Sequence, residues 1–471
     1  MAHQDDTAAI AELEEVFALQ RAAFLKNQYP SIEERKSNVG KIPGMLIANR
    51  DAIRDALNKD FGNHPESTSD LVECLGVAGR AAYVLSQLDK WLATEYRDVD
   101  GQMYGESKAE VRYQPKGVVG NIVPWNFPFD LSVGPLCEML AAGNRVVIKP
   151  SEFTPTTGAL LAKMISDTFP RDLVAVVNGG LDLSRRFSQI KWNHLLYTGA
   201  PSVGKIVMGE AAKNLTPVTL ELGGKCPCIL TPGAVTPENV HTIIGTKLLK
   251  NGQMCISVDY ILVPRADLDT FVNLTKNLFA EGAPLSGYTN SLDNTGIISS
   301  RHVERLVGLV TEAESAGVQS IALGGDPSPT DNIKRQLPLT LLIDPPRHLK
   351  AMTDEIFGPV LPILPYDSLD TSIDEINAGE RPLGLYVFSP DVNAANAIIN
   401  NTNSGGAAIN CVALQGALPS LPFGGSGMSG MGRHHGVEGF REFTFLAPYS
   451  ELANGVAEAA FQHATGVPGT V

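Results

Sequence analysis

Apolar runs of strand length alternate with helical patterns between residues 117 and 221, and this alternation limits the fold more than any other feature of the chain. Parallel strands need a crossover connection, usually a helix, so the pattern is typical of βαβ units. We expect strands at 117–123, 145–148, 173–177, 194–197 and 218–221. Helices are expected over 129–142, from Thr154-Pro155 onward and over 202–212. The segment therefore predicts a doubly wound sheet.

After Gly223-Gly224 the same alternation starts again, with strands expected near 228–230, 260–263, 321–323, 360–364 and 407–409. The fold class that we predict is α/β, with two doubly wound α/β domains. The region before Gly101 is expected to be mainly helical, and residues 109–113 alternate as one strand of a hairpin arm does. Beyond Tyr449 the chain is rich in Ala and Gly, so we expect a docking arm or a loose tail.

Charge and composition exclude several classes of partner. The 471 residues carry a formal net charge of −14 without long blocks of like charge, which argues against nucleic acid. No apolar run reaches the roughly 18 residues of a membrane span, and residues 1–25 resemble an amphipathic helix, not a signal peptide. Six cysteines are too few for a disulfide framework in a chain of this length. We therefore expect a soluble protein of the cytoplasm.

The first candidate motif runs from Gly199 to Gly204 and Lys205, between an expected strand and an expected helix. It has the form G-x-x-x-x-G-K of a phosphate loop, but Ile206 replaces the Ser or Thr that a nucleoside triphosphatase uses to hold magnesium. Glycines at this place let a backbone approach a pyrophosphate at a helix N-terminus, as a dinucleotide site requires. The alternative is a tight turn that binds nothing.

The second candidate is Lys149-Pro-Ser-Glu152, at the carboxyl end of an expected strand. Ligands of open α/β sheets bind outside the carboxyl ends of the strands, where Lys149 and Glu152 can hydrogen-bond the ribose hydroxyls of adenosine. Glu152 would repel a 2′-phosphate, which favours NAD over NADP. Read alone, the motif fits a solvated turn at a helix entry equally well.

The third candidate is the thiol of Asn251-Gly-Gln-Met-Cys255, together with the carboxylate of Glu221-Leu-Gly-Gly. A lone cysteine is more often an inert core residue than a nucleophile. Two domains, a dinucleotide loop and a carboxylate at a strand end are nevertheless the parts that thiol-based oxidation requires. Cys226-Pro-Cys228 resembles one half of a metal-binding motif, but no second pair of Cys or His ligands accompanies it. We therefore interpret both cysteines as buried thiols and expect no metal.

The fourth candidate is Asn126 of Pro124-Trp-Asn126, directly after the first expected strand. An amide there can donate a hydrogen bond to a developing oxyanion, and such a donor contributes roughly 2.7–4 kcal/mol. The alternative is a turn-forming Asn before Phe127-Pro128.

Taken in order, these motifs resemble those of the aldehyde dehydrogenase superfamily, and the match spans most of the chain. The residues that carry the resemblance are Pro124-Trp-Asn126, Lys149-Pro-Ser-Glu152, Gly199 to Gly204, Glu221-Leu-Gly-Gly-Lys225, Gly252-Gln-Met-Cys255, Glu355-Ile-Phe-Gly-Pro359 and Phe423-Gly-Gly-Ser-Gly427. Val258-Asp-Tyr260 and the short chain look more like the class 3 branch, which includes coniferyl aldehyde dehydrogenases.

The resemblance implies NAD(P)-dependent oxidation of an aldehyde to the carboxylic acid through a thioester on Cys255. In that scheme Asn126 and the Cys255 backbone N–H hold the oxyanion, and Glu221 is the general base that hydrolyses the thioester. The cofactor-binding residues that it implies are Val123, Trp125, Lys149, Glu152, Gly199, Gly204, Leu222, Gly223, Glu355 and Phe357.

Two positions depart from the pattern of the superfamily. Ala200 stands where many relatives have a Ser that reaches the pyrophosphate, so that contact falls to backbone N–H groups or is absent. Met254 precedes the nucleophile where Ile or Thr is frequent, which alters the substrate tunnel. Neither departure removes a catalytic role.

The resemblance also implies a division of the chain into domains and a homodimer. We expect a Rossmann-like dinucleotide-binding domain over 1–221 with a return segment at 412–440, a catalytic thiol domain over 222–411, and a bridging or oligomerisation arm made of 104–114 and 441–471. An aromatic or medium-chain aldehyde, coniferaldehyde-like, is the expected substrate. The alternatives are succinic or another semialdehyde, which requires an Arg in the substrate pocket, and a non-catalytic structural or binding protein that kept the fold. A thiol sealed in the interior, without a crevice between the domains, would contradict the enzyme hypothesis.

Overall fold

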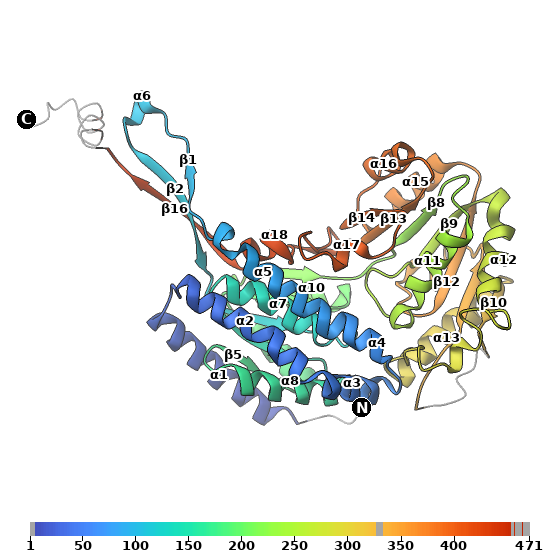
Figure 1. Ribbon diagram of the computed structural model, residues 1–471, viewed down its shortest axis with the longest axis horizontal. Coiled ribbons are helices and arrows are strands. Elements are labelled where there is room, and N and C mark those ends of the chain that lie inside the picture. Colours follow the sequence, from blue (N-terminus) through green and yellow to red (C-terminus); the bar gives the residue numbers. More distant parts are fainter. Residues whose placement is uncertain (1–4, 326–332, 454–455, 457–463, 465–471) are drawn as a thin grey trace, which may run out of the picture.

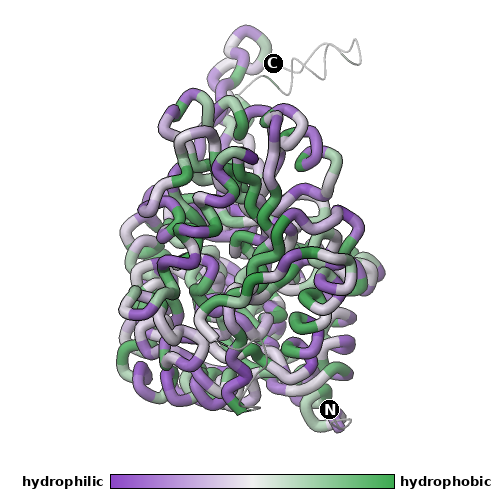
Figure 2. Tube along the Cα trace, turned by 90° about the vertical axis from the view of Figure 1, so that its right-hand side faces the viewer, coloured by the Kyte–Doolittle hydropathy of each residue, from purple (hydrophilic) through white to green (hydrophobic). Residues whose placement is uncertain are grey.

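The computed structural model describes residues 5–325, 333–453, 456 and 464, and it shows two lobes and a projecting arm (Figure 1). Each lobe is built on one open sheet, and a third sheet of three strands forms the arm. The predicted fold class, two doubly wound α/β units with a small arm, is confirmed. Figure 2 shows hydrophobic segments concentrated along the inner strands and hydrophilic ones on the outer turns.

The sheet of the first lobe has the strand order β15-β7-β6-β3-β4-β5, and every neighbouring pair is parallel except β15 with β7. Because parallel strands end at the same edge, Ile122 pairs with Lys149 and Thr198 pairs with Glu221 along one edge of the sheet. The strands are β3 (Val118–Ile122), β4 (Arg145–Lys149), β5 (Val174–Val176), β6 (His194–Thr198), β7 (Val218–Glu221) and β15 (Gly430–Met431).

Helices cover both faces of this sheet. Against one face lie α1 (Thr7–Lys26), α9 (Leu181–Gln189) and α10 (Pro201–Ala212), whose Leu13, Phe187 and Val207 share one core with the strands. The other face carries the larger core and α2 (Ile32–Ala48), α3 (Arg50–Phe61), α5 (Val77–Trp91), α7 (Asp130–Ala141) and α8 (Pro155–Thr168). The short α4 (Glu66–Thr68) and a π-helical turn, η1 (Ser69–Gly76), join α3 to α5.

The sheet of the second lobe has the order β10-β11-β12-β9-β8-β13-β14 and is parallel except at its β10 edge. Its strands are β8 (Pro227–Leu230), β9 (Tyr260–Pro264), β10 (Gln319–Leu323), β11 (Leu339–Ile343), β12 (Val360–Tyr366), β13 (Gly384–Phe388) and β14 (Gly406–Ile409). Its helices are α11 (Pro237–Leu248), α12 (Leu268–Leu278), α13 (Ser300–Ser315), α14 (Lys350–Thr353), α15 (Leu369–Ala378) and α16 (Val392–Asn400), with the short turns η2 (Leu249–Gly252), η3 (Arg265–Asp267) and η4 (Tyr288–Asn290).

After the second sheet the chain returns to the first lobe. It passes through α17 (Leu414–Ala417) to β15, where Gly430 pairs with Glu221, and then to α18 (Gly436–Glu442). Phe440 and Phe443 of this return lie in the large core of the first lobe. The return segment therefore completes the lobe that the first half of the chain began.

The arm joins distant parts of the sequence. The strand β2 (Lys108–Pro115) pairs with β1 (Glu95–Arg97) on one side and with β16 (Thr444–Glu451) on the other, and α6 (Gly101–Tyr104) closes its tip. The arm exposes large apolar side chains, among them Tyr96, Met103, Phe445, Leu446 and Leu452. Most of the expected tail after Glu451 lies outside the described residues.

The structure differs from the sequence prediction mainly by additional strands. The pattern does not indicate β1, β11, β13, β15 or β16. Because β1 and β15 have only three and two residues, their periodicity cannot separate strand from helix. The longer β11, β13 and β16 are defined by pairing with β12, β8 and β2. Thr154 does not cap α8 with its side chain; instead the Asp60 carboxylate accepts the N–H groups of Thr156 and Thr157. Among the described residues there is no helix long and apolar enough to span a membrane.

Candidate active site

Cys255 ends a turn in which three successive residues have left-handed backbone. Lys250, Asn251 and Gly252 have φ values of +54°, +52° and +75°. At Gly252 a side chain is excluded, because a Cβ would lie 2.4 Å from the carbonyl oxygen of Gly358. The turn leaves Cys255 partly exposed, although Cys226 and Cys228 are fully buried. The nucleophile candidate is thus accessible and is not sealed in the core.

Asn126 is buried and bonded directly to the thiol loop. Its Nδ2 donates to the carbonyl oxygen of Gln253 at 3.2 Å, two residues before Cys255. The Gln253 side chain in turn donates to the carbonyl oxygens of Lys250 and Gly296 and accepts the Ile298 N–H. One hydrogen of the Asn126 amide is occupied in this way, and the second donates to no other described residue.

Glu221 lies at the end of β7 with its side chain buried. Neither of its carboxyl oxygens has a hydrogen-bond partner among the described residues, and Nε2 of His434 lies 4.0 Å from Oε1. Burial raises the pKa of Glu221 well above its usual range, although Arg433 opposes this shift. Gly424 leaves room for the carboxyl group, because a Cβ there would lie 3.0 Å from Oε1. A buried carboxyl group that has no fixed partner and a raised pKa is suited to general base catalysis.

Glu355 is the second carboxyl group near the thiol. Burial, and then the negative charge of Asp259, raise the pKa of Glu355 to about 8, while the Gly224 N–H bond opposes the shift. Its Oε1 is buried and has no hydrogen-bond partner among the described residues. Gly223 must be glycine for this packing, because a Cβ there would lie 2.1 Å from Glu355 Oε2.

Both carboxyl groups affect the pKa of the Cys255 thiol. Burial raises the pKa of Cys255, and Glu355 and then Glu221 raise it further, whereas the backbone N–H groups of Cys255 and Ile256 lower it. The structure therefore brings Cys255, Glu221 and Glu355 together and joins Asn126 to them through the loop.

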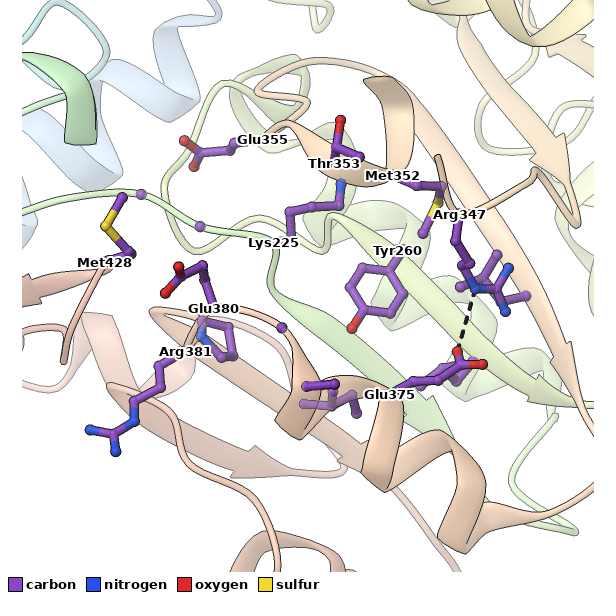
Figure 3. Close-up of a pocket in the computed structure, with 18 of the residues that line it drawn as sticks. Lys225, Tyr260, Arg347, Met352, Thr353, Glu355, Glu375, Glu380, Arg381 and Met428 are labelled. Atoms are coloured by element: carbon purple, nitrogen blue, oxygen red, sulfur yellow. Dashed lines mark hydrogen bonds and ion pairs between the residues drawn. The ribbon is translucent and has the colours of Figure 1, made fainter. Parts of the chain in front are cut away.

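A cavity of about 700 Å³ opens beside Glu355 (Figure 3). Gly223 and Gly224 line it from the first lobe side, together with Pro201, the first residue of α10. Across it lie residues of the second lobe, including an ion pair between Arg347 and Glu375 at 3.4 Å. The cavity thus lies where the two lobes meet, next to the unpartnered Glu355 oxygen.

The remaining cofactor candidates lie along the carboxyl edge of the first sheet. Val123 follows β3, and its N–H donates to the carbonyl oxygen of Lys149. Lys149 is buried at the end of β4 and forms an ion pair with the half-buried Glu152 at 3.1 Å. The Lys149 ammonium thus holds the Glu152 carboxylate at the strand end, where a ribose hydroxyl can reach it.

The two loop glycines have packing reasons as well. A Cβ at Gly199 would lie 2.4 Å from the Tyr197 hydroxyl, and one at Gly204 would lie 2.8 Å from a methyl carbon of Leu222. Ala200 offers no side-chain cap to α10, so only backbone groups are available there, as the sequence suggests. Glycines in this turn let α10 lie close against the strand end.

Trp125 and Phe357 join the two lobes. Their rings meet edge to face with centroids 5.3 Å apart, and Trp125 makes a second contact of 5.3 Å with His302. Phe357 has a φ of +49°, an unusual conformation for an aromatic residue, which is found where the surroundings fix it. An aromatic wall between Asn126 and Glu355 is therefore preformed.

Sequence reasoning missed the buried polar groups that support this site. His434 receives a hydrogen bond at its Nδ1 from Arg80, which also pairs with Glu138. Lys250 lies among Glu73, His64 and two aromatic rings. No spacing rule connects residues so far apart in the sequence. Cys226 and Cys228 are fully buried, as interpreted, with Cys228 on β8 and Cys226 directly before it. No metal-ligand cluster occurs among the residues described.

Comparison with known proteins gives the family. A model of the aldehyde dehydrogenase family matches residues 4–447. A probable coniferyl aldehyde dehydrogenase of Caulobacter vibrioides is 39% identical over 453 residues, which are 95% of this chain and 93% of the relative. The substrate-bound AldH structure of Staphylococcus aureus has a TM-score of 0.88 at 31% identity and covers 96% of this chain and 99% of that one. A Mycobacterium tuberculosis aldehyde dehydrogenase complexed with NAD⁺ has a TM-score of 0.84 at 29% identity and covers 94% and 90%.

The fold and the sequence match define an oxidoreductase of two α/β lobes. The chain belongs to the aldehyde dehydrogenase family. This membership confirms the predicted family and its general reaction, the NAD(P)-dependent oxidation of an aldehyde to the acid, and the coniferyl branch is among its relatives as predicted.

Proposed function

We propose that the protein oxidises an apolar, aromatic or medium-chain aldehyde to its carboxylic acid with NAD, through a thioester on Cys255. The observation that carries the proposal is the partly exposed Cys255 thiol, whose pKa responds to Glu221, a buried carboxyl group without a hydrogen-bond partner among the described residues, and to Glu355, whose Oε1 has none. The hydrogen bond from Asn126 to the thiol loop adds an amide donor to the same place. A non-catalytic protein has no need of these unpaired buried groups, which cost stability.

The first step starts from the Cys255 thiolate, after the thiol has lost its proton to solvent, and forms a bond between the sulfur and the aldehyde carbon. The carbonyl oxygen becomes an oxyanion, which the free hydrogen of the Asn126 amide and the Cys255 backbone N–H receive. The carbon then loses hydride, and the oxygen regains its double bond as the thioester forms. Bound NAD supplies the acceptor for that hydride.

Glu221 acts in the second step. Its carboxylate takes a proton from water while the oxygen of that water attacks the thioester carbon, and the Cys255 sulfur leaves as thiolate. The raised pKa of Glu221 makes it a stronger base than an exposed carboxylate, and Gly424 gives it room to move. The products are the carboxylic acid, the regenerated thiolate and a protonated Glu221, which returns its proton to solvent before the next turnover.

Of the residues assigned to the dinucleotide, Gly223 and Glu355 line the cavity between the lobes. We assign the unpartnered Oε1 of Glu355 to a hydroxyl of the nicotinamide ribose and the Phe357 and Trp125 wall to the ring. Val123, Leu222 and Gly223 belong to the same end of the site. At the other end, Lys149 and Glu152 bind the adenosine ribose, and the turn from Gly199 to Gly204 receives the pyrophosphate. The Glu152 carboxylate favours NAD over NADP by charge.

The surroundings of the thiol favour an apolar substrate. Cys255 packs against the core of the second lobe together with Ile256, Ala413 and Phe423. The guanidinium group of Arg433, near Glu221, donates from one nitrogen to the carbonyl oxygens of Gly405 and Gly424. The apolar neighbours of the thiol are therefore the observation that favours a coniferaldehyde-like aldehyde over succinic semialdehyde.

The test of the substrate class is kcat/KM for benzaldehyde, cinnamaldehyde, hexanal and succinic semialdehyde, each measured with NAD and with NADP. We expect the aromatic aldehydes with NAD to give the highest values. A preference for succinic semialdehyde would reject the proposed substrate class, and the absence of a burst of NADH with every aldehyde would reject the enzyme itself.

We further propose a homodimer, formed through the arm, that works in the cytoplasm. The apolar side chains exposed on β1, α6 and β16 support an interface at the arm, and six free cysteines fit a reducing compartment. The two lobes and the arm support the domain division at residues 221 and 411, with 412–440 returning to the first domain. Light scattering of the full chain tests the assembly: a monomeric mass at micromolar concentration would reject it.

A further inference from the structure

Lys250 is a fully buried lysine five residues before Cys255, within the strained turn that carries the thiol. Lys250 and Asn251 both have left-handed backbone, although neither is glycine. Such conformations persist only where the surroundings hold them. The contacts of the Lys250 side chain therefore bear on the position of the thiol loop.

The Lys250 ammonium is enclosed by four groups. It donates to His64 Nε2, lies 3.5 Å from Glu73 Oε1, and faces the rings of Phe61 at 4.2 Å and Phe127 at 4.9 Å. An acceptor, a carboxylate and two aromatic faces satisfy a buried cation. Phe127 directly follows Asn126, so the ammonium touches the segment that carries the oxyanion donor.

His64 is arranged to accept this bond. The Ser69 hydroxyl donates its hydrogen to the Pro65 carbonyl oxygen, so its oxygen accepts the hydrogen of His64 Nδ1. The other ring nitrogen is then free of hydrogen and faces Lys250. Burial and the Lys250 charge hold the pKa of His64 well below its usual range, so the ring stays neutral.

Glu73 is the second polar partner of the Lys250 ammonium. It lies on the π-helical turn η1, a rare conformation that is frequent at functional sites. Its Oε2 accepts the N–H groups of Phe129 at 2.9 Å and Asp130 at 3.0 Å, where α7 begins four residues after Asn126. Its Oε1 faces Lys250. One carboxylate thus connects the Asn126 segment to the thiol loop across fully buried space.

We infer that Lys250 and Glu73 form a buried latch that sets the Asn126 amide against the thiol loop, as positioning residues for the oxyanion site. The inference rests on the proposed function of Asn126. A second path joins the same parts, since the Gln253 side chain donates to the Lys250 carbonyl oxygen at 3.0 Å and the Gln253 carbonyl oxygen accepts Asn126. A shift of Lys250 therefore moves the atom on which Asn126 is aligned.

The latch is tested with the double variant Lys250→Met/Glu73→Gln. It removes both charges, so no unpaired charge remains buried, and Gln keeps an acceptor for the N–H groups of α7. The measurement is the single-turnover rate of NADH formation with benzaldehyde in the wild type, the double variant, Asn126→Ala and their combination. We expect the double variant to be roughly 10-fold to 100-fold slower, because misplacing a reacting group by about 1 Å costs up to that factor.

Combining the latch variant with Asn126→Ala tests whether the latch acts through Asn126. If the latch acts through Asn126, adding it to Asn126→Ala slows the rate by less than about threefold, because the same donor is already lost. Lys247→Met is the matched control: Lys247 is another buried lysine, on α11, and it donates to the Val258 carbonyl oxygen at 2.7 Å. Its effect on the rate should multiply with that of Asn126→Ala.

Three results separate the outcomes. A wild-type rate in the latch variant, or an effect that multiplies fully with Asn126→Ala, overturns the latch and leaves the proposed function intact. A wild-type rate in Asn126→Ala itself overturns the oxyanion assignment, and the latch falls with it. Should the double variant not fold, Glu73→Gln alone enters the same cycle, and the same results decide.

Discussion

Replacing Glu221 with Gln should separate the two halves of the reaction. The side chain is 1% exposed and makes no hydrogen bond to another described residue, with His434 Nε2 4.0 Å away, so the isosteric amide disturbs little of the fold. The effect then falls on chemistry. A positioned general base contributes roughly 10²-fold to 10⁴-fold, so hydrolysis of the thioester should slow by that factor, equivalent to about 2.7–5.4 kcal/mol.

The first half of the reaction should remain fast in Glu221→Gln. The negative charge of Glu221 raises the pKa of Cys255, so removing that charge lowers this pKa and does not hinder thiolate formation. Stopped-flow absorbance should show a burst of one NADH per subunit, followed by slow turnover. Mass spectrometry of the quenched protein should find the acyl group on Cys255.

The pH dependence gives a second measure of the same assignment. Glu221 acts as its carboxylate, and its pKa is raised, so wild-type thioester hydrolysis should speed up as the pH rises through that raised value. This increase in the rate of hydrolysis with pH should be absent in Glu221→Gln. Glu355→Gln is the control: it removes another buried carboxyl group near the thiol, but it should raise KM for NAD without accumulating acyl enzyme. Wild-type turnover in Glu221→Gln, without an adduct, would refute the base assignment.

Three further predictions concern the nucleophile, the cofactor and the strained turn. Cys255→Ala should abolish NADH production while NAD still raises the melting temperature; residual turnover would assign the nucleophile elsewhere. Glu152→Gln should increase kcat/KM for NADP relative to NAD by roughly 10-fold, because it removes one repulsion worth about 1.4 kcal/mol beside Lys149; an unchanged ratio would place the 2′ position away from residue 152. Gly252→Ala, with its φ of +75° and a Cβ 2.4 Å from the Gly358 oxygen, should lower the free energy of unfolding by at least about 1–3 kcal/mol in urea titrations, and a stability equal to wild type would contradict the close approach of this turn to Gly358.

The sequence predicts the two parallel sheets well because their strands are apolar and separated by whole helices. Strands β3, β4, β6 and β7 appear within a residue or two of the expected bounds. The three-residue β1 escapes prediction because it carries too little periodicity. The strands β11 and β13 escape it although they are as long as β3 and β4, so length is not the reason; their place in the sheet is set by pairing with β12 and β8.

The site shows the same division between local and distant information. Cys255, Glu221 and Asn126 stand in contiguous motifs, so each could be proposed from a few neighbouring letters. Their supporting groups could not, because Lys250 and Glu73 meet only after α3, η1, α7 and the thiol loop have packed together. No sequence motif around Glu73 indicates that it contacts Lys250.

The pairing of Gly430 with Glu221 has a consequence for how the protein is made. Every motif up to Pro359 is synthesised well before residues 412–443. The residues that cover the proposed base, Glu221, nevertheless come from this last part of the chain. A nascent or truncated chain that stops after the second sheet would contain the nucleophile, the base and the dinucleotide turn but would leave the first lobe open to water. Such an intermediate is exposed to aggregation, as is usual where distant segments must meet, and thioester chemistry begins only when the end of the chain has folded back.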